Sequence, residues 1–254
     1  MIVDEQKYHQ AAVFNSANST VATVLASVNQ VKEYLALRQN NILLATENAK
    51  LRALDSTTFF DLSTKRFNFS DTTYAVQYTY TVAKVVNNSV NNRNNFLTLD
   101  KGLANGIKPD MGVICAGGAV GVVKDVSEHF CTVQSILHSK TKASVCLTNG
   151  FYGPLTWDGS HPQFATLSEI PANLKVNKGD TVLTTSFSTI FPEGVMIGKV
   201  SKVVAGTAGD FLKITVQLST NFSNLSYVYI INNKFKLEQK SLEIKTDSLD
   251  KNGN

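Results

Sequence analysis

The feature that most constrains the fold is a stretch from Ala11 to Arg52 that contains neither proline nor glycine. Its apolar residues recur at steps of three and four, the spacing of one face of an α-helix. In the second half these steps alternate as in a coiled coil, and the seam consists of Tyr34, Leu37, Asn41, Leu44, Asn48 and Leu51. The sequence therefore predicts one long helix over residues 11–54.

The two asparagines of this seam indicate pairing with another chain. A buried asparagine pairs best with its counterpart in a second helix, which fixes register and the number of helices at some cost in stability. We therefore expect a homodimer through the helix. The alternative is an amphipathic helix lying on its own domain, which would have to satisfy Asn41 and Asn48 against a sheet.

From Phe67 onward the chain changes to short runs rich in valine, threonine, tyrosine and phenylalanine, separated by glycines and asparagines. The run YAVQYTYTV, from Tyr74 to Val82, places tyrosine and valine on one face and alanine, glutamine and threonine on the other. About a dozen such runs predict β-barrels or a sandwich, and are too many for one small barrel. The predicted fold class is mainly β with one long N-terminal α-helix.

Two polar stretches interrupt or follow these runs. We interpret NNSVNNRNN, Asn87 to Asn95, as a solvated loop, because asparagine tolerates positive φ, with a dedicated contact surface as the alternative. Residues 236–254 are charged and contain no aromatic residue, so the sequence predicts a disordered tail.

The composition, 43% hydrophobic and 17% charged, is that of a folded protein. Lysine and arginine are scattered along the chain despite a net charge of +4, which argues against binding to nucleic acid. No apolar run approaches the ~20 residues that a membrane-spanning helix needs. The N-terminus, Met1 to Glu5, does not resemble a signal peptide.

The three cysteines, Cys115, Cys131 and Cys146, each lie in an apolar run, and no pair has C-x-x-C spacing. We expect three core thiols, since free cysteine is among the most buried residue types. One disulfide plus one free thiol is the alternative.

The sequence offers little support for catalysis or for a cofactor. AGGAVG, Ala116 to Gly121, lacks the first glycine of a dinucleotide-binding turn and continues as a strand. The histidines have no zinc-ligand spacing: His9, His129, His138 and His161. A serine protease of two barrels would need a nucleophile after Gly179-Asp180, where Thr181 stands. We expect no catalytic, cofactor or metal site.

Two further stretches are specific enough for comparison with a known family. The first is NFLTLDKGLANGIKPDMGVICAGGAVGVVKDV and the second is GDTVLTTSFSTIFPEGVMIGKV. Together they resemble the MreC family of bacterial rod shape-determining proteins. One departure is Phe187, which stands where the family usually has glycine. The family-signature turns of this sequence are Lys101, Gly102, Gly106, Gly112, Gly118, Gly121, Gly179, Asp180, Phe191, Pro192, Gly194 and Gly198.

In the second stretch, Phe191 is expected to pack the loop onto the core, Pro192 to fix φ and Gly194 to permit the turn. The resemblance implies that this hairpin returns the chain from a second β domain to a first.

The resemblance also implies a coiled-coil helix followed by two small β-barrel-like domains, the second inserted into the first. The expected boundaries are a membrane-proximal segment at 1–10, the helix at 11–54, a first β domain at 55–112 and 190–235, an inserted domain at 113–189, and the tail. It further implies a membrane anchor, which this chain does not contain, and a location on the periplasmic side of the bacterial inner membrane.

The function that the resemblance implies is that of a non-enzymatic scaffold, linking the MreB cytoskeleton to peptidoglycan synthases. Implied partners are MreD, a RodA-type glycosyltransferase and a class B penicillin-binding protein, with homodimers and higher self-assembly. Exposed strand edges or grooves of the β domains are expected to bind these partners.

Two alternatives come from other classes. A periplasmic adaptor of an export pump would need two antiparallel helices flanked by lipoyl half-motifs, and one helical segment precedes the β region. A two-barrel serine hydrolase would need a reactive serine, for which Ser186 and Ser188 are the candidates.

Overall fold

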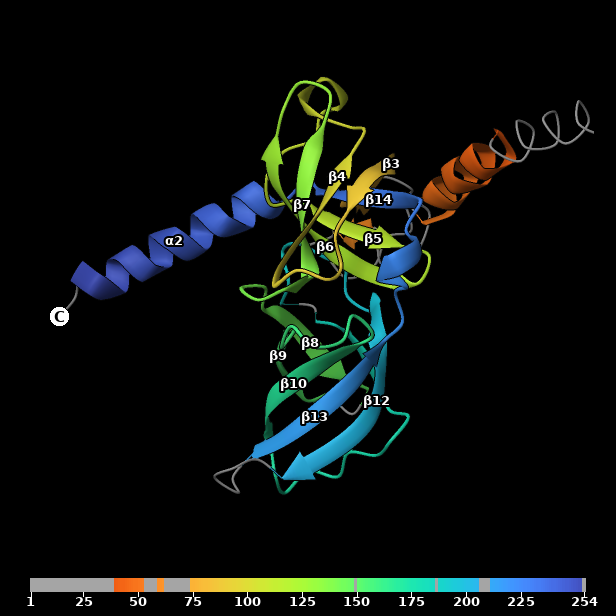
Figure 1. The fold of residues 1–254 in the computed structure, drawn as a ribbon. Helices are drawn as coiled ribbons and strands as arrows, with labels where there is room; N and C mark the ends of the chain where they lie inside the picture. Colours follow the sequence, from red (N-terminus) through yellow and green to blue (C-terminus); the bar gives the residue numbers. More distant parts are fainter. Residues whose placement is uncertain are drawn as a thin grey trace, which may run out of the picture. The chain divides into compact units, whose positions relative to one another are not determined.

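The computed structural model of the chain describes residues 39–52, 59–61, 74–148, 150–185, 187–205 and 211–252. They form mainly β structure: two closed barrels of six strands each, with two helices (Figure 1). Residues 39–52 are helical and fall within the predicted helix. The chain divides after Asn48 into two units, so the helix up to Asn48 is described apart from the body that begins at Ala49. Residues 1–38 and 53–54 lie outside the described residues.

The first barrel has the strand order β14-β3-β4-β7-β6-β5, with every neighbouring pair antiparallel. Its strand β4 alternates between exposed and buried side chains, so that Leu97 and Leu99 lie in the core. The strands are β3 (Tyr78–Asn88), β4 (Asn94–Leu99), β5 (Gly112–Cys115), β6 (Gly118–Val126), β7 (Cys131–His138) and β14 (Tyr227–Asn233).

The second barrel has the order β10-β13-β12-β11-β8-β9 and lies in the sequence between β7 and β14 of the first. Leu147, Leu167 and Ile214 are fully buried in its core. The strands are β8 (Ala143–Leu147), β9 (Tyr152–Thr156), β10 (Phe164–Pro171), β11 (Thr181–Thr184), β12 (Met196–Ala205) and β13 (Phe211–Leu218).

This topology corrects the expected boundaries of the two domains. The inserted domain was expected at 113–189, but β5, β6 and β7 pair into the first barrel, while β12 and β13 close the second. The hairpin of β11 and β12 therefore lies inside the second barrel and is not the return connection. The chain returns after β13, through the short 3₁₀ helix η3 (Phe222–Asn224). Each barrel needs all six of its strands to close, and that requirement sets the boundary.

Barrel closure also corrects the expectation of exposed strand edges. Each of the twelve barrel strands is hydrogen-bonded on both sides, so neither barrel offers an edge for an added strand. Among the described strands, β1 (Phe59–Asp61) and β2 (Tyr74–Val76) form a separate two-stranded sheet. A partner of the barrels must therefore bind side-chain surfaces or grooves.

The two barrels approach each other through backbone, because glycines stand at the contact. A Cβ added to Gly112 would lie 2.6 Å from the carbonyl oxygen of Ile190, and one added to Gly118 would lie 2.1 Å from that of Met196. Gly118 also has a φ of +140°, which L side chains rarely adopt. The glycines of AGGAVG thus bring the β5–β6 hairpin against the second barrel.

Residues 236–252 form helix α2 (Lys236–Asn252), so the prediction of a disordered tail is wrong over this range. Its lysines, glutamates and leucines are good helix formers. Gln239 Nε2 donates a hydrogen bond to Glu243 Oε1 at 3.0 Å, one helical turn along. A high charge content is compatible with a disordered tail and equally with a helix exposed to solvent, so composition alone does not distinguish the two. No helix in the described ranges is long and apolar enough to cross a membrane.

The three cysteines are free thiols. Cys115 and Cys131 are buried, as predicted, whereas Cys146 is only half-buried. Burial, with a smaller contribution from Asp100, raises the pKa of Cys131 to about 11. That thiol therefore stays protonated and unreactive at neutral pH.

The stretch interpreted as a solvated loop is held by side-chain hydrogen bonds. Asn95 is completely buried, and its Nδ2 donates to the carbonyl oxygens of Asn92 and Leu137, both at 2.7 Å. Asn88 Nδ2 donates to the carbonyl oxygen of Phe222 at 2.6 Å. Some of these asparagines are therefore structural, and Asn91, Asn92 and Arg93 remain exposed.

We predict that Gly118→Ala destabilises the protein through the contact between the barrels. Gly159→Ala is the matched control, because Gly159 also has positive φ, +88°, but has open space around it. Gly159→Ala carries backbone strain of about 1–2 kcal/mol. Gly118→Ala combines the strain of a φ of +140° with a clash between its Cβ and the carbonyl oxygen of Met196, and should lower the free energy of unfolding by about 1–3 kcal/mol more. Urea unfolding measures both. Equal losses would mean that the close approach at Gly118 contributes nothing.

Candidate functional site

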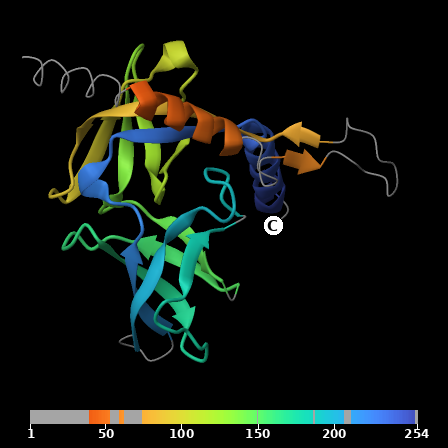
Figure 2. The same cartoon turned by 90° about the vertical axis from the view of Figure 1, so that its right-hand side faces the viewer.

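The loop between β11 and β12, residues 185–195, lies at the contact between the barrels and separates two hollows. Figure 2 shows it in cyan, reaching toward the first barrel. Thr189 and Ile190 line both hollows. We call the hollow beside β6 and β7 the junction groove and the hollow beside β14 and α2 the lysine pocket.

Hydrogen bonds from side chains fix the shape of this loop. Thr184 Oγ1 donates to the carbonyl oxygen of Pro192 at 2.6 Å and accepts from the backbone N–H of Val195 at 2.9 Å. Ser188 Oγ accepts from the backbone N–H groups of Ile190 and Phe191 at 3.2 and 3.1 Å. These hydrogen bonds hold the loop in one conformation between the two hollows.

Phe191 holds the loop on the first barrel. Its side chain is only 6% exposed, and its ring lies 3.1 Å from the position that a Cβ on Gly112 would take. Gly194, with φ of +81°, makes the turn into β12. The packing role expected for Phe191 agrees with this burial.

The junction groove has a volume of about 230 Å³ and is lined by both barrels. Val122 and Ile136 come from the first barrel, and Phe187 comes from the loop. The remaining lining residues are Gly121, Thr141, Lys142, Ala143, Ser144, Ser188, Thr189, Ile190 and Phe191.

Two exposed aromatic rings form a pair beside the junction groove: Phe187 lines the groove, and Tyr152 contacts Phe187. The ring centroids of Phe187 and Tyr152 are 5.4 Å apart at 65°, an edge-to-face pair. Phe187 is 71% exposed and Tyr152 is 61% exposed. Two adjacent exposed rings form a small apolar patch, and aromatic residues are enriched in protein interfaces.

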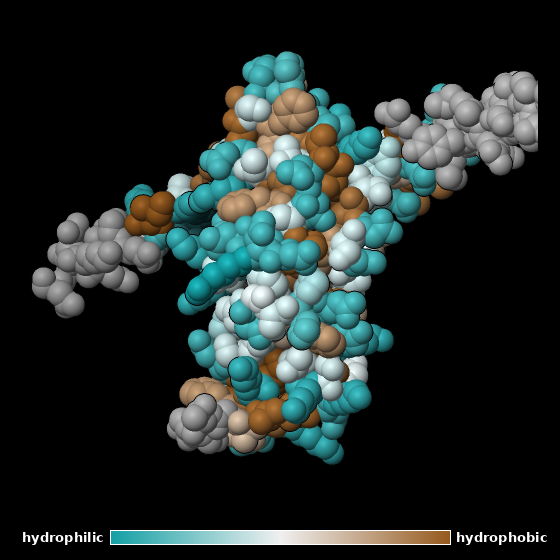
Figure 3. Space-filling model, in the orientation of Figure 1, coloured by the Kyte–Doolittle hydropathy of each residue, from teal (hydrophilic) through white to brown (hydrophobic). Residues whose placement is uncertain are grey.

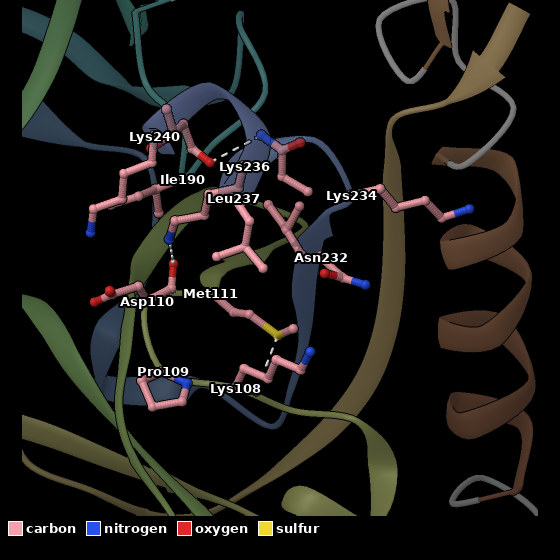
Figure 4. Close-up of a pocket in the computed structure, with 13 residues that line it drawn as sticks. Lys108, Pro109, Asp110, Met111, Ile190, Asn232, Lys234, Lys236, Leu237 and Lys240 are labelled. Atoms are coloured by element: carbon pink, nitrogen blue, oxygen red, sulfur yellow. Dashed lines mark hydrogen bonds between the residues drawn. The ribbon is translucent and has the colours of Figure 1, made fainter. Parts of the chain in front are cut away.

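The lysine pocket has a volume of about 350 Å³ and lies between the first barrel, the loop and the start of α2 (Figure 4). Its basic residues are Lys108, Lys234, Lys236 and Lys240. The remaining lining residues are Pro109, Asp110, Met111, Thr189, Ile190, Ile231, Asn232, Asn233 and Leu237.

Lys236 is half-buried, whereas the other three lysines of this pocket are exposed. Its Nζ donates a hydrogen bond to the backbone carbonyl oxygen of Asp110. Burial lowers the pKa of Lys236; the negative charge of Asp110 opposes this shift and the positive charge of Lys240 adds to it. Asn233 Nδ2 donates to the carbonyl oxygen of Thr189 at 3.1 Å and so ties the loop to β14.

The predicted signature turns do not converge on one site. Lys101 is half-buried, and the backbone of Gly102 lies against the carbonyl oxygens of Ser127 and Glu128. Gly121 and Gly198 lie against carbonyl oxygens of neighbouring strands, while Gly106 and Gly179 have positive φ. Asp180 Oδ2 accepts from the backbone N–H of Asn177 at 2.9 Å. These residues shape turns and close contacts in both barrels.

The described part of the predicted seam lies on the helix of residues 39–52. Asn41, Leu44 and Asn48 are exposed, and so is Leu51, at 60%. Asn48 Nδ2 donates to the carbonyl oxygen of Leu44 in its own helix at 3.0 Å. Tyr34 and Leu37 lie outside the described residues, and pairing through the seam stays a prediction.

The geometry gives no support to the serine hydrolase. The hydroxyl of Ser188 accepts backbone hydrogen bonds, no histidine lines either hollow, and Ser186 lies outside the described residues. In the part of the chain that the structure describes, no three residues of histidine, cysteine, aspartate or glutamate gather as they would around a metal ion.

Sequence reasoning missed Tyr152 and all four lysines of the pocket. Phe187 carried a signal, since it departs from the family pattern. Lys108 lies in the turn before β5, Lys234 directly follows β14, and Lys236 and Lys240 lie in the first turns of α2. No spacing in the sequence therefore joins the four lysines.

Comparison with known proteins gives one consistent result. The sequence matches the family model described as "Rod shape-determining protein MreC, barrel core" over residues 85–232. The cell shape-determining protein MreC of Listeria monocytogenes is 27% identical over 175 residues, which cover 67% of this chain and 59% of that protein. The chain thus spans about three-fifths of the length of this relative.

Solved structures agree with the sequence match. An MreC structure from Listeria monocytogenes aligns with a TM-score of 0.58 and 23% identity, covering 80% of this chain and 92% of that one. A structure described as the major periplasmic domain from the cell shape-determining filament MreC aligns with a TM-score of 0.51 and 26% identity, covering 62% and 99%. The family match extends over more than half of the sequence, from β3 to β14, and the chain therefore belongs to the MreC family of rod shape-determining proteins.

Proposed function

We propose that this chain is a non-enzymatic scaffold of the cell-elongation machinery that helps to maintain the shape of the bacterial cell. The observation that carries the proposal is the match of both barrels to the MreC barrel core. A scaffold must present surfaces in fixed positions, and closed barrels joined through backbone contacts are suited to that task. No observation favours the export-pump adaptor.

The proposed location is the outer face of the cytoplasmic membrane, which is the periplasmic side of the inner membrane where an outer membrane exists. The support is the solved relative at 26% identity, which is described as a periplasmic domain. In this proposal a membrane anchor elsewhere in the full-length protein holds the chain at the membrane.

The proposed self-association is a homodimer through the predicted seam. Leu44 and Leu51 are 54% and 60% exposed, and Asn41 and Asn48 lie on the same stripe. Exposed leucines at coiled-coil spacing favour pairing with a second helix. Higher assembly is supported by the description of one solved relative as a filament.

The proposed partner surface of the barrels is the junction groove with the aromatic pair beside it. Neither barrel has a free edge, so a partner must bind side chains, and Phe187 and Tyr152 offer the aromatic contacts typical of interface centres. On the face shown in Figure 3, hydrophobic and hydrophilic residues are interspersed, as is usual for a protein surface. We propose a class B penicillin-binding protein in the groove, with MreD, a RodA-type glycosyltransferase and MreB in the same assembly.

We predict that the double variant Leu44→Ser, Leu51→Ser is a monomer by analytical ultracentrifugation, while the unchanged chain is a dimer. Serine removes the apolar contacts at two seam positions. The matched control is Leu43→Ser, since Leu43 is 65% exposed but lies beside the seam, and it should remain a dimer. A dimer in the seam variant, or a monomer in the unchanged chain, contradicts the proposed pairing.

We also predict that Phe187→Ser, Tyr152→Ser in the full-length protein fails to restore cell width in cells that lack the chromosomal copy. Both side chains are exposed, so the free energy of unfolding should change by no more than about 0.5 kcal/mol per substitution. Microscopy measures cell width, and immunoblotting confirms that the variant accumulates normally.

The control for this experiment is Phe191→Ala in the same loop. Phe191 is buried, so this substitution should cost about 3–5 kcal/mol and lower the amount of folded protein. Comparing the two variants thus distinguishes a defect caused by loss of the exposed surface at Phe187 from a defect caused by loss of stability at Phe191. Full rescue by the Phe187→Ser, Tyr152→Ser variant would exclude the groove as a partner surface.

A further inference from the structure

The lysine pocket carries an excess of positive charge that its own residues do not balance. Its lining contains four lysines and one aspartate, a formal charge of +3. The single carboxylate, on Asp110, points away from Leu237 and Met111 in the close-up, while the ammonium of Lys236 bonds to the backbone carbonyl of the same residue (Figure 4). That hydrogen bond gives the ammonium group of Lys236 an acceptor, but a backbone carbonyl is uncharged and does not neutralise the positive charge of Lys236.

The pKa of Lys236 is lowered by this arrangement. It is half-buried, and Lys240 lies near enough to lower its pKa further. Partial burial and the neighbouring positive charge of Lys240 both disfavour the charged form of Lys236. A negative group that entered the pocket would offset both desolvation and repulsion.

The floor of the pocket is apolar. Ile231 and Met111 are buried beneath it, Ile190 is half-buried, and Leu237 stands at the rim with 75% of its side chain exposed. A small hydrated anion would leave this apolar surface uncovered. An extended peptide can place an apolar side chain on the floor and carboxylates against the lysines.

We propose that the lysine pocket binds an acidic peptide segment of a partner protein, in which an apolar side chain is flanked by carboxylates. Electrostatic complementarity selects the segment, and the apolar floor provides contact area. Lys236 and Lys240 pair with carboxylates on one side of the apolar side chain, and Lys108 pairs on the other. The proposal depends on the scaffold function only in taking the partner to be a protein.

Phosphate is a poorer match for these residues. Lysine pairs with phosphate and with carboxylate alike, so the four lysines do not separate the two anions. The apolar floor does, because inorganic phosphate has no apolar part to cover Ile231 and Ile190. The ammonium group of Lys236 is oriented by the backbone carbonyl oxygen of Asp110. Carboxylates on a flexible segment can reach separate lysines one by one.

The test is a titration of the purified chain with the fluorescein-labelled peptide Glu-Leu-Glu-Glu-Leu-Glu, followed by fluorescence anisotropy at low salt. Lys236→Glu, Lys240→Glu should weaken binding by about tenfold or more. The matched control is Lys199→Glu, Lys202→Glu, since both lysines are exposed on β12 and the net charge changes equally. The control variant should bind as the unchanged chain does.

A second comparison tests the apolar floor. The peptide Glu-Ser-Glu-Glu-Ser-Glu has the same charge and should bind more weakly than the leucine peptide. Leu237→Ser should weaken binding of the leucine peptide and leave that of the serine peptide unchanged. This pattern assigns the apolar contact to the pocket.

Several results would overturn the proposal. The proposal is wrong if the leucine peptide does not bind, or if Lys199→Glu, Lys202→Glu weakens its binding as much as Lys236→Glu, Lys240→Glu does. It is also wrong if the leucine and serine peptides bind with equal affinity, or if the pocket binds inorganic tripolyphosphate and not the peptide. None of them bears on the ultracentrifugation or cell-shape experiments, so failure of this site and failure of the scaffold function are distinguishable.

Discussion

The close backbone contact between the two barrels is the constraint on which the rest of the structure depends. Gly112 and Gly118 lie so near the carbonyl oxygens of Ile190 and Met196 that no side chain fits between them. Such a contact leaves little room for the barrels to slide, because any shift meets backbone atoms. The glycine-rich turn between β5 and β6, which resembles a cofactor loop in sequence, is therefore part of the contact that connects the two barrels.

Once the barrels are joined, the β11–β12 loop must lie at their contact, and its two phenylalanines take opposite roles. Phe191 turns inward against Gly112 and holds the loop, whereas Phe187 remains exposed beside Tyr152. The loop thereby separates an aromatic groove from a basic pocket. The proposed scaffold function uses these two chemically different surfaces to hold two partners at once.

Local features of the fold could be predicted from the sequence, and non-local ones could not. Alternation along β4 and the turn at Gly194 depend on neighbouring residues. The boundary at 113–189 was wrong because β5 finds its partners in β6 and in the distant β14, a pairing that no local pattern encodes. Helix α2 was missed because its charges suit a solvated helix and a disordered tail equally well. The lysine pocket is assembled from three separate segments, so only the folded chain brings it together.

The central proposal is that this chain is a scaffold and that a wall-synthesis enzyme contacts it at the junction groove. The most direct measurement is photocrosslinking in growing cells, with p-benzoylphenylalanine in place of Phe187 and, as control, in place of Phe130, which is 48% exposed and lines neither hollow. We predict a crosslinked product from position 187 alone, identified by mass spectrometry as a peptidoglycan synthase. No product at position 187, or the same product from both positions, would contradict the account.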